Sequence, residues 1–202
     1  MTASLEAQYQ QRYENILEPI SKSLEALLRE QLEGEKRIDR IVARAKSVDR
    51  FLAKAAKVED GATRYSDPLN EIQDQIGARI VTFYVADVAR IKKRVRDFYH
   101  PIEQQKLIPE KESEFGYIGE HFVLLMPSDA LGTTISADEA PKVFELQIKT
   151  LFQHAWSEAN HDLGYKPDSP LSSEQKRQIA FTAAQSWGAD HIFDRLFEGR
   201  VM

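Results

Sequence analysis

The 202-residue chain contains no cysteine, which excludes a disulfide framework, a thiolate metal site and a cysteine nucleophile. It also lacks any apolar run close to the roughly 20 residues that a membrane-spanning helix needs. The first residues, Met1–Glu6 (MTASLE), do not show the basic and then apolar pattern of a signal peptide. We therefore expect a cytoplasmic protein with no membrane partner.

Internal repeats and low-complexity segments are absent as well, and what remains is the composition of a globular protein. Charged residues make up 29% of the chain and hydrophobic residues 42%, with ten Phe and seven Tyr. A disordered chain would be poorer in aromatic residues. The length suits one domain with a helical extension, which buries roughly 70% of the unfolded surface.

Acidic residues outnumber basic ones, and the net charge of −5 argues against a general nucleic-acid coat. Two segments have the opposite balance. Residues 36–64 hold nine basic and four acidic residues, and residues 90–111 hold seven basic and three acidic ones. Such segments are able to bind a polyanion in a confined site, although a solvated helix face is the better explanation for any single charge run.

Helical periodicity is present near both ends of the chain. Residues 4–33 carry apolar residues at helical spacing, and Pro19 should kink or split this segment. We expect a short basic helix next, then a helix over 48–58 capped by Ser47 and another from Asp67-Pro68 to about residue 76, ended by Gly77. Further helices are expected over 87–99, 150–163 and 173–198.

Four segments have strand character: 79–85, 102–108, 121–126 and 142–149. Strands mixed with helices in this order indicate an α+β fold, with a mixed sheet of four to five strands flanked by helices. We expect an N-terminal helical extension over residues 1–35, a catalytic domain over 36–166 and a C-terminal helix within 167–202.

The segment 142–149 (KVFELQIK) is the most informative strand, because Phe144, Leu146 and Ile148 alternate with polar residues. Its polar side presents Glu145 and Gln147. A solvent-facing strand of an antiparallel sheet would have the same pattern.

A second feature adds weight to a functional interpretation. Asp74 lies at a predicted helix end, Gly77 follows it, and Arg79 begins the next strand. A carboxylate, a glycine that permits close approach and a guanidinium suit a site for phosphate and metal. The alternative is a helix C-terminus with an incidental Asp.

Five short motifs occur in order along the chain: Arg44-Ala45-Lys46-Ser47 with Lys54; Asp74-x-x-Gly77-x-Arg79-Ile80; Gly116-Tyr117-x-x-x-His121; Glu145-x-Gln147-Ile148-Lys149-Thr150; and His161-x-x-x-Tyr165-Lys166. Together they resemble the synthetase domain of RelA/SpoT homologues, specifically the small single-domain alarmone synthetases. The resemblance covers about residues 40–166. It implies a nucleotidyltransferase-like fold that transfers pyrophosphate from ATP to the 3′-hydroxyl of GDP or GTP, making (p)ppGpp and releasing AMP.

The resemblance also implies roles for several residues of these motifs and for two residues near them. The catalytic residues and Mg²⁺ ligands would be Asp74 and Glu145, with Glu145 also accepting the hydroxyl proton. The ATP-binding residues would be Arg44, Lys46, Lys54, Lys57 and Arg79. The acceptor-binding residues would be Tyr117, which stacks on the base, with His121, Gln147, Lys149 and His154. For Lys57, a plain surface charge is an equally good explanation.

Helical spacing puts His154, Glu158 and His161 on one face of a helix, but over two turns, which is an unattractive geometry for one metal ion. The loop Gly116–His121 (GYIGEH) departs from the common family pattern Gly-Tyr-Arg-Ser-x-His. Its missing Arg and its added Glu120 bear on the identity of the acceptor more than on the ATP half of the site.

Two alternatives stay open. One is a toxin-type pyrophosphokinase that modifies the tRNA 3′ end and needs an antitoxin partner. The other is an inactive nucleotide-binding or scaffold protein. We expect a guanine nucleotide rather than tRNA, because the basic residues gather where ATP is expected and leave few for RNA phosphates. A homo-oligomer is compatible with the long amphipathic ends, but apolar stripes also serve the core of a monomer.

Overall fold

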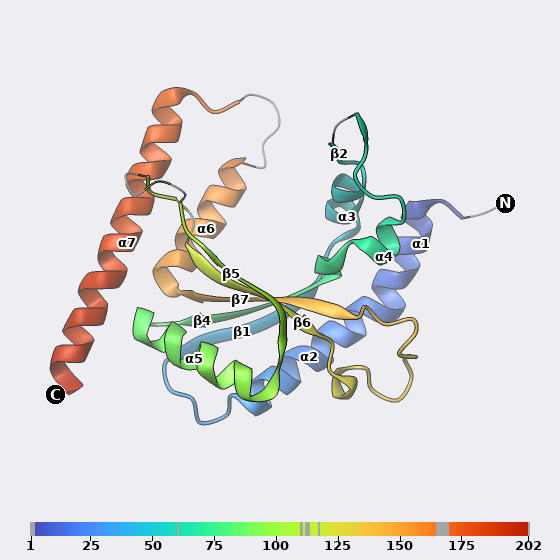
Figure 1. Cartoon of the computed structure of the whole chain (residues 1–202), viewed down its shortest axis with the longest axis horizontal. Coiled ribbons are helices and arrows are strands. Elements are labelled where there is room, and N and C mark those ends of the chain that lie inside the picture. Colours follow the sequence, from blue (N-terminus) through green and yellow to red (C-terminus); the bar gives the residue numbers. More distant parts are fainter. Residues whose placement is uncertain are drawn as a thin grey trace.

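Five strands form one mixed sheet in the order β1-β4-β7-β6-β5 in the computed structural model of the chain (Figure 1). The structure describes residues 3–59, 61–109, 111, 114–116, 118–164 and 170–201. The strands are β1 (Ile38–Ala45), β4 (Ile76–Thr82), β5 (Pro101–Leu107), β6 (Gly119–Leu125) and β7 (Val143–Thr150). Strands β4 and β7 are parallel, and the other neighbours are antiparallel. A separate sheet pairs β2 (Val58–Glu59) with β3 (Ala62–Thr63).

Helices flank this sheet on both faces and at one end. They are α1 (Leu5–Arg12), α2 (Glu18–Gln31), α3 (Val48–Ala55), α4 (Pro68–Glu71), α5 (Val85–Phe98), α6 (Leu151–Gly164) and α7 (Ser173–Val201). A π-helical turn, η1 (Tyr13–Leu17), joins α1 to α2, and two 3₁₀ turns are η2 (Gln73–Gln75) and η3 (Ser128–Ala130). Within the described part of the chain, no helix has the length and apolar character needed to cross a membrane.

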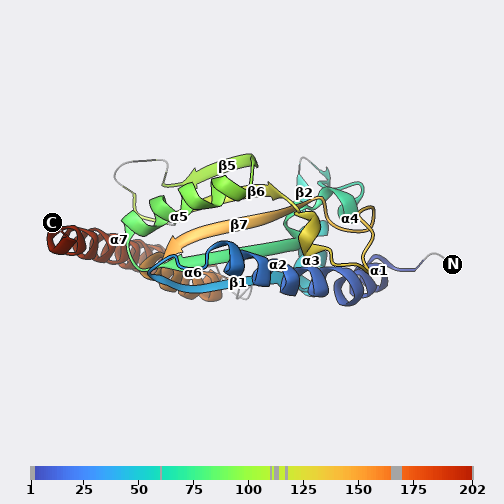
Figure 2. The ribbon, with the colours of Figure 1, turned by 90° about the horizontal axis from the view of Figure 1, so that it is seen from below.

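The two faces of the sheet differ in chemistry because side chains alternate along each strand. On the central strand β7, Phe144, Leu146 and Ile148 are fully buried. They face α2 and α5, which lie below the sheet in Figure 1 and in front of it in Figure 2. The opposite face carries Glu145 and Gln147, and α3 and α6 rise above it on either side (Figure 1). The fold therefore leaves one polar sheet face open between two helices.

The predicted N-terminal helix is divided just before Pro19, as its sequence requires. Pro19 lies in the first turn of α2, directly after the π-helical turn η1. Proline has no N–H to donate, and its ring crowds the carbonyl four residues earlier, so the helix widens at this point. The prediction of a kink or a split at Pro19 is confirmed.

The short basic helix predicted before Ser47 is wrong, since this segment forms the edge strand β1. Ile41, Ala43 and Ala45 alternate toward the core and pack beside α2, and β1 pairs along its length with β4. Val42 and Arg44, which lie between them, are exposed on the other side of the strand. The density of basic residues concealed a two-residue period, and pairing with β4 decided the structure.

The helix predicted from Asp67-Pro68 to residue 76 is also wrong in extent, because α4 ends at Glu71. Ile72 is extended, and the side chain of Gln75 donates to the carbonyl oxygens of Leu69 (2.7 Å) and Ile72 (3.0 Å). Gly77 consequently lies inside β4, and this strand begins earlier and ends earlier than the predicted 79–85. Tyr84, not Asp87, is the N-cap of α5.

The other predicted helices and strands are confirmed to within a few residues. Together with the five-stranded mixed sheet, they confirm the predicted α+β fold class.

Replacing Phe144 by alanine tests the packing beneath β7. The ring is fully buried and meets Tyr99 edge-on at 5.7 Å. Phe144→Ala should lower the free energy of unfolding by about 3–5 kcal/mol, because a buried aromatic ring leaves a cavity. Urea denaturation measures the loss, with Leu125→Ala, a 57% exposed residue, as the control. A loss below about 1 kcal/mol would contradict the assigned core.

Candidate active site

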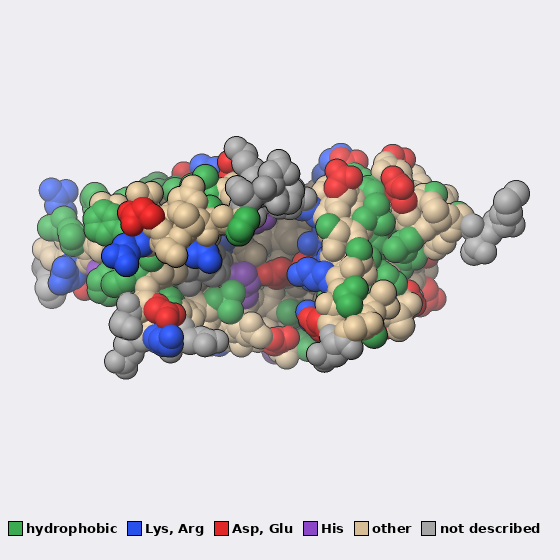
Figure 3. Space-filling view, turned by 90° about the horizontal axis from the view of Figure 1, so that it is seen from above, with side chains coloured by type: hydrophobic (Ala, Val, Ile, Leu, Met, Phe, Trp, Pro, Cys, Tyr) green, Lys and Arg blue, Asp and Glu red, His purple; other side chains and the backbone are tan. Residues whose placement is uncertain are grey.

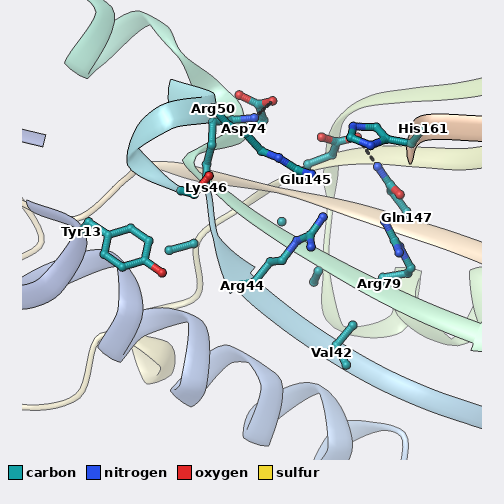
Figure 4. A pocket seen from close by; sticks show the side chains of 14 residues that line it. Tyr13, Val42, Arg44, Lys46, Arg50, Asp74, Arg79, Glu145, Gln147 and His161 are labelled. Carbon is teal, nitrogen blue, oxygen red and sulfur yellow. Dashed lines mark hydrogen bonds and ion pairs between the residues drawn. The ribbon is translucent and has the colours of Figure 1, made fainter. Parts of the chain in front are cut away.

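A cavity of about 640 Å³ opens on the polar face of the sheet, over β1, β4 and β7. Its lining includes Arg44, Lys46, Asp74, Arg79, Glu145 and Gln147. Figure 3 shows it as a hollow near the middle of the molecule, where basic, acidic and histidine side chains gather. Figure 4 shows these side chains pointing into one space from three strands and the turn before β4. Six of the residues predicted from motifs are therefore brought together.

Asp74 is held between two lysines at the edge of the cavity. Its carboxylate forms ion pairs with Lys46, at 2.9 Å from Oδ2, and with Lys54, at 2.9 Å from Oδ1. Lys46 follows β1, and Lys54 lies in the last turn of α3. Asp74 itself has a non-helical backbone (φ −87°, ψ 35°) within η2. One carboxylate thus neutralises part of the charge of two cations, of which Lys46 lines the cavity and Lys54 does not.

Glu145 lies on the central strand and is held by two neighbours on the same face. Its Oε1 is 2.7 Å from His121 Nδ1 and accepts from Gln147 Nε2 at 3.1 Å. Burial alone would raise the pKa of this carboxyl, but the hydrogen bonds from His121 and Gln147 outweigh it and lower the pKa to about 2. Glu145 is therefore ionised at neutral pH and is a weak proton acceptor.

Arg44 and Arg79 are diagonal neighbours on β1 and β4, since Arg44 is opposite Gly77 and Val42 is opposite Arg79. An added Cβ at Gly77 would meet no atom within 4 Å, so the missing side chain leaves free space in the cavity itself. Burial and the second guanidinium lower the pKa of Arg44. Two planar cations beside each other can stack on an aromatic ring and bind phosphate.

Arg79 is fixed by two side chains of α6. Its Nη1 donates to Glu158 at 2.7 Å and lies 3.3 Å from His154 Nδ1. The predicted shared face of α6 is confirmed for these two residues, which orient a guanidinium together.

A family model described as "Region found in RelA / SpoT proteins" matches residues 43–170. The chain belongs to the RelA/SpoT family. A curated relative, the GTP pyrophosphokinase YjbM of Bacillus subtilis (strain 168), is 32% identical over 129 residues. That alignment covers 61% of this chain and spans only 58% of the length of the relative.

Two solved structures of small alarmone synthetase 1 from Bacillus subtilis have the same fold as this RelA/SpoT protein. One superposes with a TM-score of 0.73 at 24% identity and covers 96% of each chain. The other, bound to its product pppGpp, gives a TM-score of 0.70 at 23% identity over 96% of this chain and 97% of that one. They confirm the fold expected from the resemblance.

Several predicted site residues of this RelA/SpoT member lie elsewhere. Lys57 is exposed at the end of α3 and does not line the cavity. Lys149 is on the correct face of β7 but is buried under α6, with Nζ 3.2 Å from Ser157 Oγ. His154 does not line the cavity and lies beside Arg79. Tyr117 lies outside the described residues.

Glu120, which departs from the common family loop, does not face the cavity. Neighbouring residues on β6 point to opposite faces, so His121 meets Glu145 while Glu120 turns toward α5. The buried Glu120 carboxylate accepts from Lys92 at 2.9 Å. Its negative charge is thus paired with Lys92 on the far side of the sheet, away from the cavity.

The site residues missed from the sequence are Tyr13, Arg50 and His161, which also line the cavity. Arg50 could have been found, because it precedes Lys54 by one turn of α3. Tyr13 carries no such signal, since only the crossing of the N-terminal helical segment brings it to β1 (Figure 4). His161 was noticed for its spacing on α6 but was given no role.

Asp74 and Glu145 supply the hard oxygen ligands that suit Mg²⁺. Among the residues that the structure describes, no cluster of three His, Cys, Asp or Glu could hold a metal alone. Two carboxylates completed by phosphate oxygens and water are the usual arrangement for Mg²⁺ at a phosphate-transfer site. The donor set therefore fits a metal that arrives with a nucleotide.

The buried Lys149 gives a pH-dependent test of the packing between β7 and α6. Burial and the nearby Arg79 lower its pKa from 10.5 to about 8. The folded state then binds fewer protons than the unfolded state between about pH 8 and 10.5, so stability should rise with pH in that window. We expect Lys149→Met to be more stable than wild type at pH 7, with an advantage that shrinks by pH 9.5. Urea unfolding at both pH values measures it, and a less stable variant at pH 7 would contradict this reasoning.

Proposed function

We propose that the chain is an Mg²⁺-dependent pyrophosphotransferase that moves pyrophosphate from ATP to the 3′-hydroxyl of GDP or GTP, releasing AMP and making (p)ppGpp. The observation that carries this proposal is the cavity in which Asp74 and Glu145 meet Arg44, Lys46 and Arg79 in a RelA/SpoT family member, with Lys54 ion-paired to Asp74. The name of the YjbM relative and the pppGpp complex of the Bacillus subtilis synthetase support it.

The ATP half of the site would be built from β1, α3 and β4. Arg44 and Arg79 stand where an adenine ring can stack on a guanidinium. Lys46 and Lys54 would contact the triphosphate, because charge-assisted contacts to phosphate are strong. Both lysines are already within 2.9 Å of Asp74, so ATP binding would exchange a carboxylate partner for phosphate oxygens.

Asp74 and Glu145 would hold Mg²⁺, which would neutralise charge on the phosphate oxygens during transfer. The release of Lys46 and Lys54 to phosphate leaves Asp74 available as a ligand. The pKa of Glu145, about 2, favours the ligand role over the role of proton acceptor that its motif also implied. His121 and Gln147 fix the orientation of its carboxylate.

The acceptor half would be reached from β6 and β7. His121 and Gln147 lie beside Glu145, and Gln147 lines the cavity. Tyr117 stays the proposed stacking residue. Lys149 is too deeply buried for direct contact, so its contribution would be a positive charge below the site. With Glu120 turned away, a guanine nucleotide remains the proposed acceptor.

Chromatographic identification of products tests this function. Labelled ATP is incubated with GDP, GTP or tRNA, and AMP release is measured with each acceptor. Label in pppGpp or ppGpp is the expected result. Label in tRNA alone would establish the toxin-type reaction, and no AMP with any acceptor would establish a binding protein; either result would overturn the proposal.

Asp74→Asn and Glu145→Gln should each lower the rate of AMP formation by at least about 100-fold, because electrostatic stabilisation at a metal site is worth several kcal/mol. Both replacements keep the size of the side chain, so thermal unfolding should show an intact fold. Asp129→Asn, on an exposed turn, is the matched control. Wild-type rates in either variant would remove that residue from the mechanism.

Lys54 and Lys57 form a matched pair, since Lys54 lies in the last turn of α3 and Lys57 follows that helix by two residues, but only Lys54 has an ion pair with Asp74. Arg44→Ala and Lys54→Ala should weaken binding of a non-hydrolysable ATP analogue about 10- to 100-fold, as expected for losing a charged hydrogen bond of roughly 1.5–3 kcal/mol. Lys57→Ala should change it less than twofold, although the resemblance implied ATP binding. Calorimetric titration decides, and equal losses for the two lysines would contradict the assigned triphosphate position.

A further inference from the structure

The C-terminal helix α7 lies beside α6 and contacts α5 (Figure 1). Trp156 on α6 donates to Thr182 Oγ1 at 3.1 Å. Phe193 stacks on Phe152 of α6 at 5.6 Å, and Phe197 stacks on Tyr84 at the start of α5 at 4.5 Å. The 29-residue helix α7 is therefore held by three contacts, two with α6 and one with the start of α5.

Asp190 ties the middle of α7 to the strand that carries the site. Its carboxylate is 2% exposed and accepts from Thr150 Oγ1 at 2.8 Å. Thr150 is the last residue of β7, on the same face as Ile148 and five residues after Glu145. Burial raises the pKa of Asp190 to about 6. A buried polar contact of this kind fixes one register between α7 and β7.

Trp187, one turn before Asp190, projects toward the segment between β5 and β6. Its ring meets Phe115 edge-on at 5.9 Å with an interplanar angle of 63°. Trp187 and Ile118 line a cavity of about 310 Å³ at the edge of the sheet, and the same pair with Gly116 lines a smaller one. Trp187 thus contacts Phe115 and shares the walls of two cavities with Ile118, which follows Tyr117 in the sequence.

We propose that Trp187 is a positioning residue for acceptor binding, because its ring contacts Phe115 and it lines two cavities together with Ile118. This inference rests on the proposed function, in which the same segment contacts the acceptor. Ile118 stands where the common family pattern has an Arg. With an apolar residue there, contacts with α7 would supply part of the ordering that an Arg–phosphate contact would otherwise provide.

The expected consequence is selective. Ordering a binding segment before the ligand arrives lowers the entropy lost on binding, so its loss weakens binding of that ligand alone. Trp187→Ala should raise KM for GDP or GTP about 5- to 10-fold and leave KM for ATP within twofold. Trp187→Phe keeps an aromatic edge and should restore most of the loss.

Hydrogen–deuterium exchange tests the anchoring without turnover. Trp187→Ala and Phe115→Ala should each raise exchange several-fold in the peptide covering residues 107–118 and leave β4 unchanged. Phe115 is 41% exposed, so this variant should fold normally. Leu196→Ala, 60% exposed on the same helix, is the control. The double variant should exchange no faster than either single one, because both remove the same contact.

The outcomes separate the two proposals. Unchanged exchange in both single variants, or equal changes of KM for ATP and for the acceptor, would overturn the positioning role. Increased exchange in a protein whose wild type forms no product would leave the anchoring standing and overturn the proposed function.

Discussion

The central strand β7 must bury one face and expose the other, and the active site depends on this constraint. Phe144, Leu146 and Ile148 fill the core, so the two-residue period turns Glu145 and Gln147 toward the opposite face. The parallel neighbour β4 places Gly77 beside Glu145 and Arg79 beside Gln147. A shift of register by one residue would exchange the carboxylate for a buried leucine or phenylalanine, which links the stability of the core to the chemistry of the cavity.

The charges of the cavity are paired with one another in the absence of substrate. Asp74 is ion-paired with both Lys46 and Lys54, Glu158 is ion-paired with Arg79, and His121 lies beside Glu145. Because of these pairs, several charges of the same sign can lie close together without a buried charge that lacks an opposite partner. In the proposed reaction, the phosphates of a nucleotide would pair with the lysines and arginines, and Mg²⁺ would pair with the two carboxylates. The nucleotide and Mg²⁺ would therefore be expected to bind together.

Features that depend on a local period or a local motif could be predicted from the sequence. The alternation in β7 and the spacing of Asp74, Gly77 and Arg79 predicted a polar face with a carboxylate and a guanidinium. Features that depend on pairing or packing with a distant strand or helix could not be predicted from the sequence. Strand β1 was predicted as a helix, because its pairing with β4 is not visible in its composition. The direction of Glu120 and the burial of Lys149 depend on α5 and α6, which pack against β6 and β7 from distant parts of the chain.

In the proposed reaction, Lys46 and Lys54 exchange Asp74 for phosphate oxygens when a nucleotide binds. A crystal structure with Mg²⁺ and a non-hydrolysable ATP analogue shows whether this exchange takes place. We expect an adenine ring beside Arg44 and Arg79, both lysines on phosphate oxygens, and Asp74 turned to the metal. A nucleotide bound elsewhere, with both lysines still on Asp74 at their present 2.9 Å, would contradict it.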